Sequence, residues 1–106
     1  MTSIEIEITR FVDNDQPGFV ECTLVDAEGM KHTFVEKAPV VSSESLLSTS
    51  AYPCRGAIAC EVQERWTSRR GDALVRVSTD KPWGIESSEG VSTFVVSASQ
   101  LRAVAE

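Results

Sequence analysis

Histidine and serine are the side chains of this sequence that could supply acid–base or nucleophilic catalysis. The single histidine, His32, alternates with Met30 and Phe34 along one face of an extended segment. An imidazole on such an apolar face is more typical of a hydrogen-bonded residue at the edge of a core than of a catalytic base. Serine is abundant, but the G-x-S-x-G pattern that presents a nucleophilic serine is absent from the sequence. The sequence therefore predicts no catalytic residue.

Cysteine and aspartate are the side chains that could bind a metal ion. Five residues lie between Cys54 and Cys60, whereas about two to four residues lie between the paired ligands of structural zinc sites. Cys22 and Cys60 alternate with Val, Leu and Ile, where a thiol behaves as a small apolar side chain. The segment 13–18 begins like a calcium-binding loop, but Pro17 stands where an oxygen ligand is needed. We therefore predict no metal site and no cofactor.

Two clusters of residues favour a binding surface. Trp83 lies between Pro82 and Gly84, where it could anchor a partner or fold back to cap the core, and we favour the core cap. Arginines and a tryptophan surround a hairpin at 65–70, which is either a solvated loop or a contact site for an acidic partner or single-stranded nucleic acid. The candidate binding surface comprises Trp83, Pro82, Ile85, Tyr52, Arg65, Arg69 and Arg70.

The elements that must position these residues are predicted by alternation of apolar and polar side chains, which indicates half-buried strands. Six strands are expected, over residues 4–12, 20–24, 30–37, 57–66, 73–79 and 91–97. A break in the alternation at Phe11 and Val12 predicts a β-bulge near Arg10. Between the strands, the pattern predicts a helical turn within 42–47, a type I turn at 81–84 and a short helix over 98–106.

Composition and charge exclude several classes of function. The chain has 106 residues, a net charge of −6 and a pI near 4.7, and residues 1–53 carry nine acids against three bases. Binding to nucleic acid or to anionic lipid draws on a basic surface, so neither is expected. The number of cysteines is odd, three, which argues against a disulfide framework and favours a reducing cytoplasm. No apolar run is long enough to span a membrane, and we expect one domain over 1–106.

Three strings of the sequence resemble small uncharacterised bacterial proteins of about this length. They are FVDNDQPG at 11–18, VEKAPVV at 35–41 and KPWGIES at 81–87. The similarity spans most of the chain, and no known activity is attached to it. The resemblance therefore implies a bacterial, cytosolic, single-domain protein and assigns no functional residue.

Together these observations predict an all-β domain, a small, mainly antiparallel six-stranded barrel or two-sheet sandwich with a short C-terminal helical turn. The function that fits best is a cytosolic interaction or accessory domain of the antitoxin, immunity or regulator type. The acidic first half would face a basic protein partner. The alternatives are a small-ligand-binding barrel, with the ligand in the barrel mouth near Trp83 and His32, and an enzyme of unrecognised type. The sequence does not specify the oligomeric state.

Overall fold

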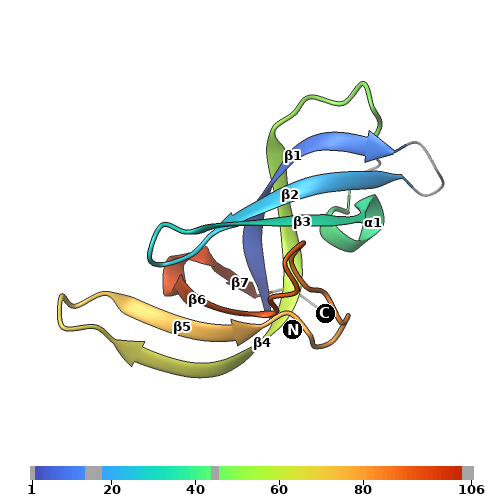
Figure 1. The fold of residues 1–106 in the computed structure, drawn as a ribbon. Coiled ribbons are helices and arrows are strands. Elements are labelled where there is room, and N and C mark those ends of the chain that lie inside the picture. Colours follow the sequence, from blue (N-terminus) through green and yellow to red (C-terminus); the bar gives the residue numbers. More distant parts are fainter. Residues whose placement is uncertain (1, 14–17, 44–45, 104–106) are drawn as a thin grey trace.

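The computed structural model describes residues 2–13, 18–43 and 46–103, and it shows an all-β fold (Figure 1). The strands are β1 (Thr2–Asp13), β2 (Phe19–Val25), β3 (Lys31–Lys37), β4 (Cys54–Thr67), β5 (Ala73–Ser78), β6 (Thr93–Ser97) and β7 (Leu101–Ala103). Two short helical segments interrupt them, α1 (Ala38–Val41) and the 3-10 turn η1 (Ala98–Gln100). No helix in the described residues is long and apolar enough to cross a membrane.

The strands form one curled, antiparallel sheet in the order β3-β2-β1-β4-β5-β6. β4 is the hinge of this sheet, because its first half pairs with β1 and its second half pairs with β5. Figure 1 shows the consequence: β1–β3 form one layer, β5 and β6 form a second, and β4 runs between them. β7 lies outside this order and pairs with the first residues of β1. The predicted antiparallel, partly open barrel is therefore confirmed.

The core fills the inside of this curl, and the alternation in β1 shows how the sequence builds it. Ile4, Ile6 and Ile8 are buried, whereas the intervening Glu7 is exposed. Each fully buried Val, Leu, Ile or Phe contributes about 1.5–3 kcal/mol relative to an exposed one. The largest fully buried side chains, each under 2 % exposed, are Phe34, Ile4, Ile8, Leu24, Ile58, Val20, Val41, Val75, Val77 and Val96, with Thr79 and Cys22.

The open side of the curl lies between β3 and β6, where no continuous ladder joins the two strands among the described residues. Isolated backbone hydrogen bonds bridge it instead: Ala27 N–H donates to Val95 O at 2.9 Å, and Ser88 N–H donates to Thr33 O at 2.8 Å. The rings of Phe34 and Phe94 also meet across this opening, with centroids 5.7 Å apart. The open side is thus bridged by two backbone hydrogen bonds and an aromatic contact.

Register shifts in two strands adjust the directions of their side chains. The predicted bulge near Arg10 is confirmed, because the β1–β2 register shifts between Ile8 and Arg10. The β4–β5 register also shifts between Val62 and Glu64, at a place where the alternation in the sequence predicts no bulge. Bulges bend a strand and increase its twist, which suits the turn of β4 from one layer into the other.

The helical segments differ from those predicted. The helix of the long connection is α1 at Ala38–Val41, before the expected 42–47, and part of that expectation, residues 44–45, lies outside the described residues. At the C-terminus only η1 is helical. Leu101–Ala103 is the strand β7, and residues 104–106 lie outside the described part. The longer C-terminal helix is therefore wrong in its second turn, because pairing of Leu101 with Ile4 provides ladder hydrogen bonds that override local propensity.

Candidate functional site

Trp83 lies on the surface, at the corner of the loop that connects β5 and β6. Its side chain is 63 % exposed, whereas Ile85, two residues later, is 3 % exposed. The expected core cap is therefore wrong: Ile85 fills the core and Trp83 points away from it. The same finding removes Ile85 from the candidate binding surface and leaves Pro82 and Trp83 exposed there.

The buried residue Thr79 fixes the base of this loop. Its Oγ1 donates to Ile85 O at 2.7 Å, and its backbone N–H donates to Ser92 O at 2.8 Å. The Ile85 N–H in turn donates to Thr79 O at 3.0 Å. These hydrogen bonds join the two ends of the loop and so fix the backbone on either side of Trp83.

The turn itself is not the predicted type I turn. The Lys81–Pro82 peptide bond is cis, and Gly84 N–H donates to Asp80 O at 2.7 Å. Gly84 has a φ of +65°, a backbone conformation in which other residues are strained. Pro82 at the second position and Gly84 at the fourth position of 81–84 therefore correctly predicted a turn. They did not predict that the Gly84 N–H bonds to Asp80 rather than to Lys81.

A groove of about 750 Å³ lies beside Pro82, at the point where β4 leaves β1. It is lined by Thr2, Cys60, Glu61, Val62, Lys81 and Pro82. The β1–β4 ladder ends at the pair Thr2–Cys60. Within the described ranges, no strand covers the remaining edge of β4 from residue 61 to 67. An exposed tryptophan, an apolar hollow and an unpaired strand edge thus lie at one end of the sheet.

The remaining predicted surface residues lie elsewhere. Tyr52 is half-buried and its hydroxyl donates to Leu47 O at 2.7 Å, just before β4 begins at Cys54. Because Cys54 and Cys60 are six residues apart on β4, about 20 Å of strand separates this end from the groove beside Pro82. Tyr52 therefore does not border the surface of Trp83.

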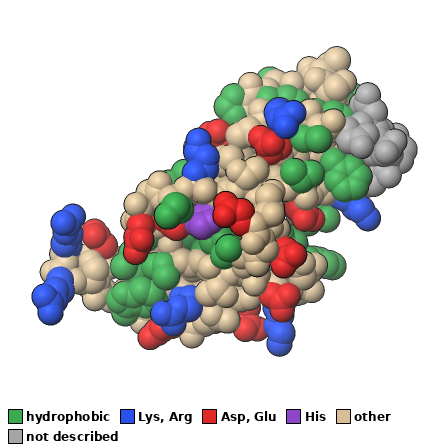
Figure 2. Space-filling model, viewed as in Figure 1, with side chains coloured by type: hydrophobic (Ala, Val, Ile, Leu, Met, Phe, Trp, Pro, Cys, Tyr) green, Lys and Arg blue, Asp and Glu red, His purple; other side chains and the backbone are tan. Residues whose placement is uncertain are grey.

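The predicted arginine cluster occupies the β4–β5 hairpin. Arg69 and Arg70 are exposed at its tip, and Figure 2 shows basic side chains gathered at this end of the molecule. The tip and the Trp83 turn are at opposite ends of β5, whose six residues span about 20 Å. Arg65, in β4, lies opposite Val75 and is also exposed. The structure therefore divides the seven predicted surface residues among three places.

Trp66 and Arg76 pack together near the base of this hairpin. The Arg76 guanidinium lies 5.5 Å from the Trp66 ring centroid, a cation–π arrangement, and it also forms an ion pair with Glu64. Arg76 therefore pairs with Glu64 within the hairpin, whereas Arg69 and Arg70 lie beyond this contact, at the tip. The arrangement is that of a solvated hairpin with a basic tip.

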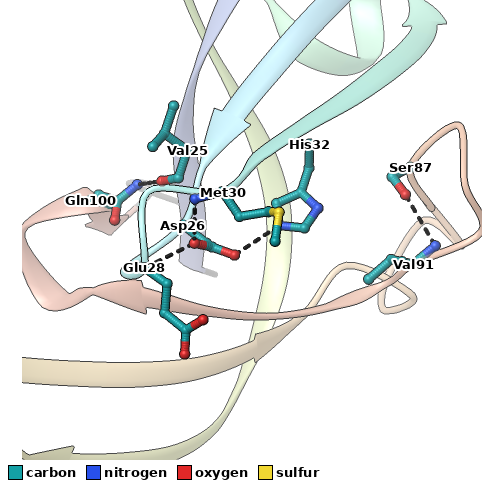
Figure 3. Close-up of polar contacts among 8 residues, drawn as sticks. All are labelled: Val25, Asp26, Glu28, Met30, His32, Ser87, Val91 and Gln100. Carbon is teal, nitrogen blue, oxygen red and sulfur yellow. Dashed lines mark hydrogen bonds and ion pairs between the residues drawn. The ribbon is translucent and has the colours of Figure 1, made fainter.

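His32 belongs to a polar cross-link of the β2–β3 hairpin (Figure 3). Its Nε2 lies 2.9 Å from Asp26 Oδ2, and the other oxygen of Asp26 accepts the N–H groups of Glu28 and Met30, each at 2.9 Å. Burial raises the pKa of Asp26, but hydrogen bonds from His32, Met30 and Glu28 outweigh it and hold this pKa below its usual value.

The surroundings of the imidazole give it a structural role. The His32 and Phe94 rings pack in a T-shaped arrangement with their centroids 4.8 Å apart. The His32 side chain is 18 % exposed and is visible on the face drawn in Figure 2. Met30, expected on the same inner face, is instead 60 % exposed because β3 begins at Lys31. The histidine is therefore held by the same carboxylate that closes the turn of the β2–β3 hairpin.

Cys22 lies in β2, whereas Cys54 and Cys60 lie in β4, and Cys22 and Cys54 lie opposite Ile8 on either side of β1. Cys22 is fully buried and Cys60 nearly so, and burial raises the pKa of their thiols to about 12 and about 11. Cys54 is half-buried at the start of β4. Among the residues that the structure describes, no group of three or more His, Cys, Asp and Glu side chains is placed to hold a metal ion.

We expect Cys54 to react with a thiol reagent in the native protein well before Cys22 and Cys60. The thiolate is the reacting species, and burial of the other two thiols both blocks access and raises their pKa. Labelling with a maleimide, followed by peptide mass spectrometry over time, measures the three rates. Equal rates for all three in the folded protein would contradict the strand faces described above.

Comparison of the chain with family models, with curated proteins and with solved structures finds no match in any of the three.

Proposed function

We propose that this protein is an interaction module that binds a protein partner through the surface formed by Pro82, Trp83 and the adjoining groove. The exposed indole of Trp83 on a hydrogen-bonded base carries this proposal. A large aromatic side chain with few rotatable bonds loses little entropy on binding, and tryptophan is enriched among interface anchors. The apolar hollow beside Pro82 extends the area that a partner could cover.

The charge around Trp83 favours a basic partner. Glu61 lines the groove, and Asp80, Glu86 and Glu89 are exposed in the loop that carries Trp83, against a single base, Lys81. The net charge of −6 adds a long-range attraction for a positively charged protein, and such steering weakens as salt is added. An acidic surface that binds a basic protein fits a role for this chain as an antitoxin, an immunity protein or a regulator.

The cellular setting is part of the same proposal. We propose a bacterial cytoplasm, on the basis of the odd number of cysteines and the resemblance of three strings to small bacterial proteins.

Replacement of Trp83 by alanine tests the proposal. Because the indole is 63 % exposed, W83A should change the free energy of unfolding by less than about 1 kcal/mol in urea denaturation. A photo-crosslinking amino acid at position 81, which lines the groove and leaves Trp83 in place, is introduced in cells of the source organism and identifies the protein that contacts this turn. W83A should then weaken binding of that purified protein by at least about 2 kcal/mol, as measured by calorimetry.

Leu47 provides the matched control, because it is a large apolar residue of similar exposure, 61 %, in a different loop. L47A should leave the affinity unchanged. Equal losses for W83A and L47A, or a crosslinked partner that is acidic, would refute the surface proposed here.

A further inference from the structure

A second groove, of about 510 Å³, lies on the outer face of the sheet, away from Trp83. Its lining includes Glu7, Thr23, Val25, Lys31, Arg55 and Gln100. Its volume falls in the range of small-molecule sites, about 300–1,000 Å³.

The groove coincides with an interruption in the hydrogen-bonded ladder of β1. On this side, β1 pairs with β7 up to Ile4 and with β2 from Glu7 onward. In the described part of the chain, Glu5 and Ile6 thus have no strand partner here. Because successive residues of a strand direct their backbone groups to opposite sides, one of these two turns its N–H and C=O toward the gap. The groove therefore offers backbone hydrogen bonds to an extended ligand.

The walls of the groove are held in place before any ligand binds. The Gln100 side chain accepts from Ser97 N–H at 2.9 Å and donates to Val25 O at 2.8 Å, which links η1 to the end of β2. On the opposite wall, Glu5 forms ion pairs with Arg55 and Arg102. A site that is already ordered loses less conformational entropy on binding.

Two opposite charges in this groove are not used by the fold. Glu7 and Lys31 are exposed, and neither side chain has a hydrogen-bond or ion-pair partner among the described residues. Glu7 lies opposite Thr23, and Lys31 lies opposite Val25, which is two residues further along β2, so the two are about 12 Å apart across two strand spacings. This separation exceeds that of the charges in a single amino acid and suits the two ends of a short peptide.

We propose that the groove binds a short peptide with free termini, with its ammonium group at Glu7 and its carboxylate at Lys31. The peptide crosses the outer face of β2 between these two residues, beside the interruption in β1 at Glu5 and Ile6. This site is separate from the Trp83 surface, so its test does not depend on the function proposed above.

Trialanine is the probe, and amide chemical shifts of the isotopically labelled full chain report its binding. Trialanine should produce saturable shifts at Glu7, Thr23 and Lys31. N-acetylated trialanine and C-amidated trialanine should each bind at least about fivefold more weakly, because each loses a charge-assisted hydrogen bond. Free alanine should also bind more weakly than trialanine, because it cannot reach both charges.

Lysine variants test the assigned orientation. K31Q should weaken trialanine by at least about fivefold and leave the C-amidated peptide unaffected. K37Q is the matched control, since Lys37 is exposed at the other end of β3, and it should bind trialanine as the original protein does. Absence of saturable shifts, equal binding of the blocked peptides, or equal effects of K31Q and K37Q would overturn the proposal.

Discussion

Phe34→Ala should lower the free energy of unfolding by about 3–5 kcal/mol, the usual range for emptying a buried aromatic site. Phe34 is fully buried, and its ring meets that of Phe94 across the open side of the barrel. The ladder does not close this side, so loss of the ring removes a main contact between β3 and β6. Chemical denaturation followed by far-UV circular dichroism measures the change.

Val35 supplies the control for this prediction. It is the next residue of β3 and is 44 % exposed on the opposite face. V35A should therefore stay within about 0.5 kcal/mol of the original protein. A larger loss for V35A than for F34A would mean that β3 presents its other face to the core.

The faces of the strands were predictable from the sequence because alternation is a local signal. Ile4, Ile6 and Ile8 must share a face in any extended segment, and burial of that face follows from their apolar character. The bulge near Arg10 was also predictable, since it is the local way to absorb a break in alternation.

The candidate site was less predictable because two nearby apolar residues competed for the core. Local sequence places both Trp83 and Ile85 after Pro82 and does not say which of them is inward. The outcome depends on Thr79, whose hydroxyl binds the Ile85 carbonyl and so directs the Ile85 side chain into the barrel. A buried hydrogen bond between two turns of the chain leaves no periodic signal in the sequence.

Long-range pairing explains the other differences. Leu101 pairs with Ile4, close to the opposite end of the chain, and this contact replaces the C-terminal helix that local propensity favoured. Both grooves also arise from where ladders stop, beside Cys60 in β4 and between Ile4 and Glu7 in β1. The end point of a ladder is a property of two strands together, so neither strand's sequence shows it.

Gly56→Ala should lower the free energy of unfolding by about 2–3 kcal/mol, toward the upper part of the range for overpacking a core. Gly56 lies in β4 opposite Ile6, with α1 packed above it. A Cβ at this position would stand 2.6 Å from Val41 O and 2.7 Å from Ile8 Cδ1, distances that real Cβ atoms essentially never show. Because Val41 O is backbone, α1 itself must move, and urea denaturation should show a lower midpoint.

The double variant with Ile8→Val separates the Val41 O contact from the Ile8 Cδ1 contact, because valine lacks Cδ1 while the Val41 carbonyl and a γ-carbon, at 2.9 Å in Ile8, remain. If the carbonyl contact dominates, the losses from G56A and I8V add, since removal of Cδ1 does not relieve the clash. If the Ile8 contact dominates, the double variant is more stable than the sum of the two single changes. A midpoint for G56A equal to that of the original protein would show that α1 does not press on β4 at this residue.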